Sequence, residues 1–311
     1  MRILFVKTSS LGDVVHNCPA VSEAARRNPG ARIDWIVEEP FAAVAALHAS
    51  VEHVIPIAVR RWHGALFSPR TWSEFGAFRA ALRRERYDCV IDTQGLLKSA
   101  LITALAQGDT HGYDRASARE PVAARFYLHR HEVTQALHAV ERNRKLTAVA
   151  LGYAVEGDCD YGLRVAGAVP EPRALLFTMT SRADKLWPEE HWRALGAGLA
   201  AHGLQCVLPW GNEEERRRCA RIAAAIKDAV VPPHMALGEL AAQIARARCV
   251  AGVDTGLTHV AAALGVPVLG IYCGSDPALT GLYGSARARN VGSAGRPPSP
   301  MEALAALGNL A

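Results

Sequence analysis

Short apolar runs alternate with longer amphipathic segments along the whole chain. In the first half, apolar runs predict strands at 2–7, 32–38, 52–57 and 87–92, and amphipathic segments predict helices at 14–28, 39–48, 72–86, 96–106 and 136–151. Strands that alternate with helices through short connections are typical of a parallel, doubly wound α/β sheet. The first half therefore predicts one such sheet.

The same alternation begins again after about residue 170, beyond a turn-rich stretch at 152–172. Here the pattern predicts strands at 174–179, 204–209, 227–231, 248–253 and 267–273, and helices at 189–202, 213–226, 237–246 and 258–264. We therefore predict two Rossmann-like domains, 1–160 and 161–311, with a ligand-binding cleft between them. A last short helix at 301–308 should begin with Ser299 as N-cap and Pro300 as its first residue.

The turn after the strand at 248–253 carries Asp254, Thr255 and Gly256 and leads into a helix. Open α/β sheets bind ligands at the carboxyl ends of their strands, and the free N–H groups of a helix N-terminus attract phosphate. Gly256 would let a ligand approach the backbone closely. The alternative is that Asp254 or Thr255 only caps the helix.

The turn after the first strand, 7–13, also combines polar residues with glycine and ends at Asp13. It lacks the G-x-G-x-x-G fingerprint, which argues against a dehydrogenase, and Lys7 precedes the glycine, which argues against a P-loop. What this turn offers is one carboxylate, Asp13, at a loop-to-helix junction. The alternative is again a helix cap.

Three further turns supply candidate binding groups. After the strand at 174–179, Thr180, Ser181 and Lys185 offer two hydroxyls and an ammonium, which suit a diphosphate and could neutralise a leaving nucleotide without a metal. Three glutamates at 213–215 suit the dipole of a helix N-terminus, although one of them could bind a ribose. The turn that contains Gln94 should line the acceptor side.

The net charge of +5 is concentrated in the first half, where many arginines predict an anionic partner. They include those at 60, 61, 83, 84, 86, 115, 119, 125 and 130. Aromatic residues are sparse and do not interleave with these arginines, which argues against nucleic acid. The alternative is a solvated arginine-rich surface.

The remaining composition indicates a cytoplasmic protein. No apolar run reaches the roughly 18 residues that a membrane-spanning helix needs, and no signal-peptide pattern precedes Lys7. Seven scattered cysteines without a C-x-x-C pair predict reduced, buried thiols. His129 and His131 lie two residues apart, but a metal site there is not favoured.

Eight segments, taken in order, resemble the ADP-heptose-dependent lipopolysaccharide heptosyltransferases, and in particular their type I members. They lie at 7–13 (KTSSLGD), 60–62 (RRW), 91–96 (IDTQGL), 119–121 (REP), 138–142 (HAVER), 185–192 (KLWPEEHW), 208–211 (LPWG) and 253–259 (VDTGLTH). The resemblance implies a GT-B fold and an inverting glycosyltransferase that needs neither metal nor cofactor. It implies transfer of L-glycero-D-manno-heptose from ADP-heptose to the Kdo residue of Kdo-lipid A, at the cytoplasmic face of the inner membrane.

The resemblance also implies roles for particular residues. Asp13 would be the general base, and Lys185 would stabilise the departing diphosphate. The donor would be bound by Thr180, Ser181, Lys185, Glu213, Met235, Asp254, Thr255, Gly256 and His259, and the acceptor by Ser10, Gly12, Arg60, Arg61, Gln94 and Arg119. The family commonly has Thr-Thr where this chain has Thr180-Ser181, and often His where it has Thr178, so no role for that imidazole applies here.

Two other hypotheses stay open. One is a type II heptosyltransferase with a heptose acceptor, although the segments at 7–10 and 60–62 favour type I. The other is a non-catalytic nucleotide-binding protein of the same fold, against which the presence of both Asp13 and Lys185 argues.

Overall fold

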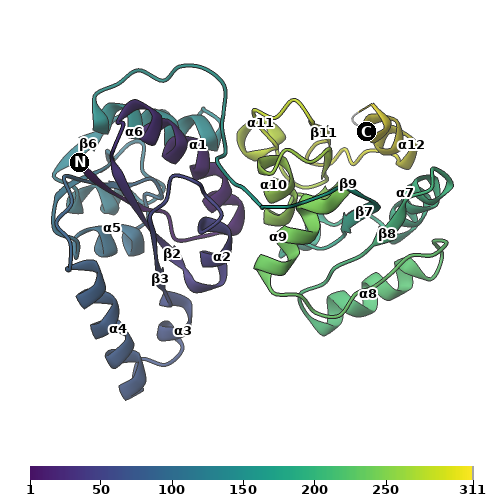
Figure 1. Cartoon of the computed structure of the whole chain (residues 1–311), viewed down its shortest axis with the longest axis horizontal. Helices are drawn as coiled ribbons and strands as arrows, with labels where there is room; N and C mark the ends of the chain where they lie inside the picture. Colours follow the sequence, from purple (N-terminus) through teal and green to yellow (C-terminus); the bar gives the residue numbers. More distant parts are fainter. Residues whose placement is uncertain (310–311) are drawn as a thin grey trace. The chain divides into compact units, whose positions relative to one another are not determined.

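The computed structural model describes residues 1–309, which form two compact units, one from Met1 to Leu163 and one that begins at Arg164 (Figure 1). The division falls three residues beyond the boundary expected from the sequence. Each unit is built around one parallel sheet with helices on both faces, as the alternating pattern predicts.

The first unit contains a six-stranded sheet in the order β3-β2-β1-β4-β5-β6, and every pairing is parallel. Its strands are β1 (Arg2–Val6), β2 (Arg32–Glu38), β3 (His53–Ile57), β4 (Cys89–Asp92), β5 (Asp109–Tyr113) and β6 (His129–His131). β1, β2 and β4 are almost wholly buried, because their continuous apolar runs are covered on both faces.

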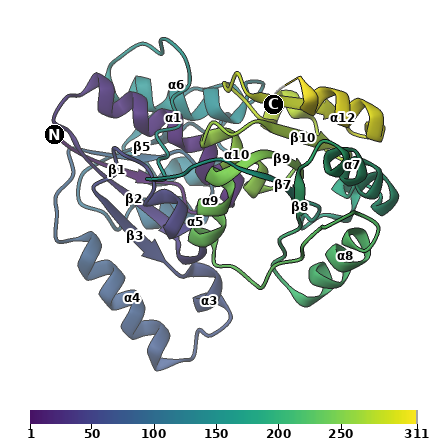
Figure 2. The same ribbon diagram turned by 45° about the vertical axis from the view of Figure 1, so that its right-hand side comes forward.

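The helices of the first unit are α1 (Leu11–Arg27), α2 (Ala42–Ala45), α3 (Val59–His63), α4 (Pro69–Leu82), α5 (Leu97–Thr103) and α6 (Ala139–Leu151), with 3₁₀ turns η1 (Glu39–Phe41) and η2 (Pro121–Phe126). α1 and α6 lie side by side in both views (Figures 1 and 2). A buried ion pair joins them, because Nε of Arg144 on α6 donates to Oε2 of Glu23 on α1 at 2.9 Å.

Three expectations for the first unit need correction. The helix expected at 39–48 is only η1 followed by the four-residue α2, because the helix ends at Ala45 and His48 instead forms a β-bridge with Leu163. β5 and β6 were not expected, because their sequences, DTHGY and HRH, lack an apolar run or alternation. The short α3 was also missed.

The second unit contains a five-stranded parallel sheet in the order β11-β10-β9-β7-β8. Its strands are β7 (Glu171–Phe177), β8 (Gln205–Val207), β9 (Ala247–Val253), β10 (Val268–Tyr272) and β11 (Ala288–Gly292). The strand expected at 227–231 is wrong, since only Val230 bridges to Val207, and β11 was not expected from its polar sequence.

The helices of the second unit are α7 (Glu189–Ala201), α8 (Glu213–Ala223), α9 (Leu237–Arg246), α10 (Gly256–Ala263), α11 (Pro277–Thr280) and α12 (Pro300–Gly308), with the 3₁₀ turn η3 (Ala183–Lys185). α7, α8 and α12 share one hydrophobic core with the sheet. As predicted, Ser299 caps α12 and Pro300 is its first residue.

The strand order explains which turns meet. β1 pairs with β4 so that Val6 lies opposite Asp92, and β9 lies between β7 and β10 with Gly252 opposite Phe177 and Val253 opposite Ile271. Parallel neighbours end at the same edge of a sheet, so the turns that follow them are adjacent. Within residues 1–309, no helix is long and apolar enough to span a membrane.

Candidate functional site

Asp13 lies in the first turn of α1, which begins three residues earlier than the sequence predicted. The backbone N–H of Ser10 donates to Oδ2 of Asp13 at 3.0 Å, so the interpretation of Asp13 as a helix cap is partly right. Arg119 then reaches it from the loop before η2, with Nη2 donating to Oδ1 at 2.8 Å. The structure thus brings together three residues of the predicted acceptor side.

Two cations act on this carboxylate. Burial alone would raise the pKa of Asp13, but the charges of Lys7 and Arg119 outweigh it and hold that pKa well below its usual range. Lys7 is itself buried, and its Nζ donates to the Thr93 carbonyl at 2.8 Å. Burial lowers the pKa of Lys7 to about 8. Asp13 is therefore ionised at neutral pH, the state that a general base requires.

The interpretation of the sequence included Lys7 in the segment 7–13 but assigned it no role. Its position at the end of β1, one turn before Asp13, was the signal that could have identified it. A lysine directly after an apolar strand is placed at the carboxyl edge of the sheet, where functional groups collect.

Gln94 faces the interior of the first unit. Its Oε1 accepts from the backbone N–H of Thr8 at 2.7 Å and from the Thr8 hydroxyl at 2.8 Å. Gln94 thereby ties the turn after β4 to the turn after β1, and Lys98 adds a bond from Nζ to Ser9 Oγ at 2.9 Å. Gln94, predicted to bind the acceptor, is therefore buried and bonded to Thr8 in this structure.

Arg60 and Arg61 lie on α3, which follows the edge strand β3, two strands from β1. The guanidinium of Arg61 pairs with Glu74 at 2.6 Å and with Glu39 at 3.0 Å, so its charge is largely neutralised. Arg60 forms no ion pair within residues 1–309, and its guanidinium lies 5.5 Å from the centre of the Phe41 ring. The two neighbours therefore differ in the charge that they offer to a ligand.

In the second unit, Asp254 at the end of β9 is the centre of a polar cluster. Lys185 Nζ donates to its Oδ2 at 2.7 Å, Ser275 Oγ donates to the same oxygen at 2.6 Å, and His259 Nε2 lies 3.5 Å from Oδ1. Thr180 Oγ1 donates to the Asp254 carbonyl at 3.2 Å. Four predicted donor residues thus meet, and Ser275, which the sequence interpretation missed, follows the neighbouring strand β10.

Burial alone would raise the pKa of Asp254, but hydrogen bonds from His259, Lys185 and Ser275 outweigh it and hold that pKa well below its usual range. Asp254 is therefore ionised at neutral pH and forms an ion pair with the Lys185 ammonium. An incoming phosphate would compete with Asp254 for that ammonium.

The N-terminus of α10 has no side-chain cap. Thr255 occupies the N-cap position, but its side chain makes no capping hydrogen bond, so the capping interpretation of this turn is wrong. The Thr258 hydroxyl bonds the Val253 carbonyl at 2.8 Å, and it packs so close to Gly252 that a Cβ there would lie 2.1 Å from its Oγ1. The first turn, which begins at Gly256, presents its N–H groups to a ligand without competition from the cap residue.

The other predicted residues take no part in this cluster. Glu213 begins α8 and pairs with Arg216 at 2.8 Å, an exposed arrangement that agrees with the dipole interpretation. Met235 lies half-buried before α9, and Ser181 is exposed in the loop after β7. Thr178 is buried with its Oγ1 3.6 Å from Cys219 Sγ, which is a packing contact.

No group of three or more His, Cys, Asp or Glu side chains within residues 1–309 could hold a metal ion. His129 and His131 each stack on His111, at 4.5 and 5.3 Å between ring centres. The seven cysteines are free thiols, and all but Cys159 are buried, as the sequence predicted.

Comparisons with known proteins identify the family of the chain. Residues 75–303 match the sequence profile of glycosyltransferase family 9 (heptosyltransferase). The chain belongs to this family. It is 46% identical over 291 residues to lipopolysaccharide heptosyltransferase 1 of Escherichia coli strain K12, which covers 91% of both chains.

Two solved structures are similar to this family 9 glycosyltransferase. One is E. coli heptosyltransferase WaaC with ADP, at a TM-score of 0.93 and 42% identity over the whole of both chains. The other is the same E. coli protein with ADP-2-deoxy-2-fluoro heptose, at a TM-score of 0.85 and 43% identity over 95% of this chain and 94% of that one. The predicted family, the GT-B class of fold and the glycosyltransferase class of enzyme are thereby confirmed.

Proposed function

We propose that this glycosyltransferase moves L-glycero-D-manno-heptose from ADP-heptose to the Kdo residue of Kdo-lipid A, with inversion of the anomeric centre. The observation that supports this most strongly is the agreement of two things. One is the cluster of Thr180, Lys185, Asp254 and His259 beside an uncapped helix N-terminus. The other is the match to E. coli structures named for ADP and an ADP-heptose analogue.

In this proposal the second unit holds the donor. The diphosphate binds at the N-terminus of α10, with the hydroxyls of Thr180 and Ser181 and the Lys185 ammonium as further donors. As the glycosidic bond to the nucleotide breaks, negative charge grows on the departing phosphate, and these groups stabilise it. Thr255, Gly256 and His259 complete the turn, Asp254 orients it and contacts the heptose, and Glu213 and Met235 contact the nucleoside.

The first unit holds the acceptor, and Asp13 accepts the proton of the attacking hydroxyl. Arg119 binds the acceptor carboxylate, which loosens its pair with Asp13 and raises the affinity of Asp13 for a proton when the acceptor is present. Ser10 and Gly12 shape the turn after β1, and Gln94 holds that turn in place through Thr8. Arg60 and Arg61 contact acidic groups of the acceptor that lie farther from Asp13. No step in this scheme uses a metal or a cofactor.

A transfer assay tests this proposal. Purified protein should transfer heptose from ADP-heptose to Kdo-lipid A, and the anomeric configuration of the product, read by NMR, should be opposite to that of the donor. A preference for an acceptor that already carries heptose would instead favour a type II enzyme. ADP binding without transfer to either acceptor would favour a non-catalytic protein.

We also propose that the protein works in the cytoplasm and binds the membrane surface peripherally. The tip between α3 and α4 supports this, because Phe67 is fully exposed and Leu66 and Trp72 are more than half exposed. Residues 59–72 contain three arginines, of which Arg61 and Arg70 pair with Glu74 and Arg60 forms no ion pair within residues 1–309. Exposed aromatic and aliphatic side chains beside arginines are typical of an interfacial membrane contact.

Sedimentation with lipid vesicles tests the membrane contact. Wild-type protein should co-sediment with vesicles rich in phosphatidylglycerol, and Phe67→Ser should weaken that binding several-fold. Val169→Ser, which removes an exposed apolar side chain from the second unit, is the matched control and should bind normally. Equal binding by both variants would contradict the assignment of this tip.

A further inference from the structure

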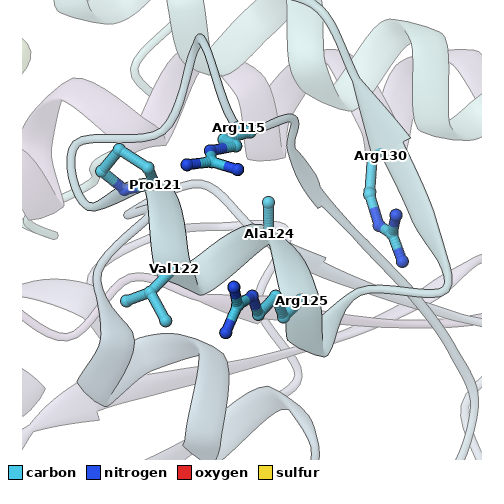
Figure 3. A pocket seen from close by; sticks show the side chains of 6 residues that line it. All are labelled: Arg115, Pro121, Val122, Ala124, Arg125 and Arg130. Carbon is cyan, nitrogen blue, oxygen red and sulfur yellow. The ribbon is translucent and has the colours of Figure 1, made fainter.

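A pocket of about 460 Å³ opens in the first unit beside η2 (Figure 3). Its lining consists of Arg115, Pro121, Val122, Ala124, Arg125 and Arg130. The volume lies within the range of small-molecule sites, roughly 300–1,000 Å³. Three arginines contribute to this lining, and Pro121 and Val122 add apolar side chains, so positive charge and apolar surface lie together here.

None of the three arginines is neutralised by the protein. Within residues 1–309, Arg115, Arg125 and Arg130 form no ion pair, and the only side-chain bond of the three is from Arg130 Nε to the Tyr127 carbonyl at 3.4 Å. Arg61, by contrast, already has two carboxylate partners. Three unpaired positive charges in the lining of one pocket attract an anion, which would reduce the repulsion among them.

The backbone that carries these arginines is held firmly. Tyr127, directly after η2, is buried, and its hydroxyl donates to Oδ2 of the buried Asp92 at 2.7 Å. Tyr127 packs so close to Gly112 of β5 that a Cβ at that glycine would lie 2.3 Å from the ring. At the other end of η2, the N–H of Glu120 donates to the Gly95 carbonyl at 3.0 Å. These contacts fix the backbone of η2, from which the Arg125 side chain extends.

The pocket is close to the candidate general base. Pro121 on its edge is two residues from Arg119, and two extended residues span at most about 7 Å. Arg119 in turn bonds Asp13 at 2.8 Å. The pocket and the Arg119–Asp13 pair thus lie on the same loop region of the first unit.

We propose that the pocket formed by Arg115, Arg125 and Arg130 binds a lipid phosphate group. A phosphate has the charge and the several acceptor oxygens that three planar guanidinium groups recognise, and the apolar edge suits the lipid next to it. The source of the phosphate is either the acceptor lipid itself or a phospholipid headgroup beside it. The first source rests on the proposed function, whereas the pocket's affinity for phosphate does not.

A direct binding measurement tests the pocket without reference to activity. Wild-type protein is modified with phenylglyoxal with and without inorganic phosphate, and the modification of each arginine is read by peptide mass spectrometry. Phosphate should slow modification of Arg115, Arg125 and Arg130 several-fold more than that of Arg83 and Arg84, two exposed arginines after α4. Equal protection of all five would overturn the proposal.

Kinetics and vesicle binding then identify the source. Arg115→Ala/Arg125→Ala should raise the KM for phosphorylated Kdo-lipid A about tenfold if the acceptor supplies the phosphate. Its KM for an acceptor without lipid phosphates, its kcat and its KM for ADP-heptose should stay near wild-type values. Arg83→Ala/Arg84→Ala removes the same charge elsewhere and should leave all these constants unchanged.

If a phospholipid supplies the phosphate, the pocket variant should instead lose binding to phosphatidylglycerol vesicles while its acceptor KM stays normal in detergent. A pocket variant that matches the Arg83→Ala/Arg84→Ala control in both measurements would overturn the proposal. If wild-type protein transfers no heptose, the proposed function fails, and the phenylglyoxal and vesicle measurements still decide whether the pocket binds phosphate.

Discussion

Replacement of Lys185 by alanine, alone and together with Asp254→Asn, separates two possible roles of its ammonium group. In the structure the ammonium neutralises Asp254 at 2.7 Å, and in the proposed reaction it stabilises the departing diphosphate. The single change removes both effects. The double change removes the carboxylate charge as well, so that only the effect on the donor remains.

The expected effect of Lys185→Ala on the stability of the ligand-free protein follows from the burial of the ion pair. Asp254 is 9% exposed and Lys185 18% exposed, so the pair lies between a buried one, whose disruption costs about 3–5 kcal/mol, and a surface one worth about 0.2–1 kcal/mol. Asp254 keeps its bonds to Ser275 and His259 in Lys185→Ala. We therefore expect a loss of about 1–2 kcal/mol in the free energy of unfolding, or about 2–8 °C in Tm.

Transfer should respond differently. Lys185→Ala should lower kcat about 10²-fold, the usual effect of removing one group that stabilises transition-state charge. Asp254→Asn alone frees the ammonium, so ADP should bind at least as tightly as in wild type, whereas use of ADP-heptose should fall because a heptose contact is lost.

The double variant decides between the two roles. Differential scanning calorimetry should show that its stability returns toward the wild-type value, and the transfer assay should show that its kcat stays low. If transfer recovers together with stability, Lys185 serves only to neutralise Asp254, and its assignment to the diphosphate is refuted.

Three further predictions test other parts of the structure. Arg60→Ala and Arg119→Ala should each raise the KM for the acceptor, with little effect on the KM for ADP-heptose. The wild-type KM for the acceptor should rise with salt, since exposed charges are screened beyond about 8 Å. A KM for the acceptor that does not depend on salt and is unchanged in both variants would mean that these arginines only make the surface soluble. Burial lowers the pKa of His111 to about 4, so between pH 6.5 and 4 the unfolded chain binds a proton at this residue that the folded chain does not. The urea midpoint of unfolding should therefore fall as the pH drops through this range. His111→Gln should weaken this pH dependence and His202→Gln should not, and equal pH profiles for the two variants would contradict the shift. Arg144→Ala removes the nearest cation of the buried Glu23 carboxylate, which keeps only Arg26 at 3.6 Å and the N–H of Glu156 at 3.0 Å. The loss in urea unfolding should approach the roughly 3–5 kcal/mol of a broken buried pair, and a loss below about 1 kcal/mol would contradict this.

The sequence predicted the strands that carry apolar runs, including the edge strands β3 and β8, but not β5, β6 and β11. β1, β2, β4, β9 and β10 are buried on both faces and therefore appear as apolar runs. β5, β6 and β11 lie at or near an edge of their sheets and carry polar residues, so their identity depends on pairing with a neighbour that the local sequence does not contain.

The candidate site shows the same distinction. The turns around Asp13 and Asp254 were recognisable, because a polar cluster between an apolar run and a helix is a local pattern. The partners were not, because Arg119 reaches Asp13 across 106 residues and Lys185 reaches Asp254 across 69. For the same reason the sequence could not distinguish the neutralised Arg61 from Arg60, since Glu39 and Glu74 come from separate elements.

The most direct test of the central claim is the rate of heptose transfer to Kdo-lipid A by Asp13→Asn protein. Asparagine keeps the shape of the side chain and can still accept the hydrogen bond from the Ser10 N–H, so the fold and ADP binding should be preserved. We predict that kcat falls about 10²-fold or more, because the attacking hydroxyl loses its proton acceptor. Turnover within a few-fold of wild type, by a variant that binds ADP normally, would contradict the account.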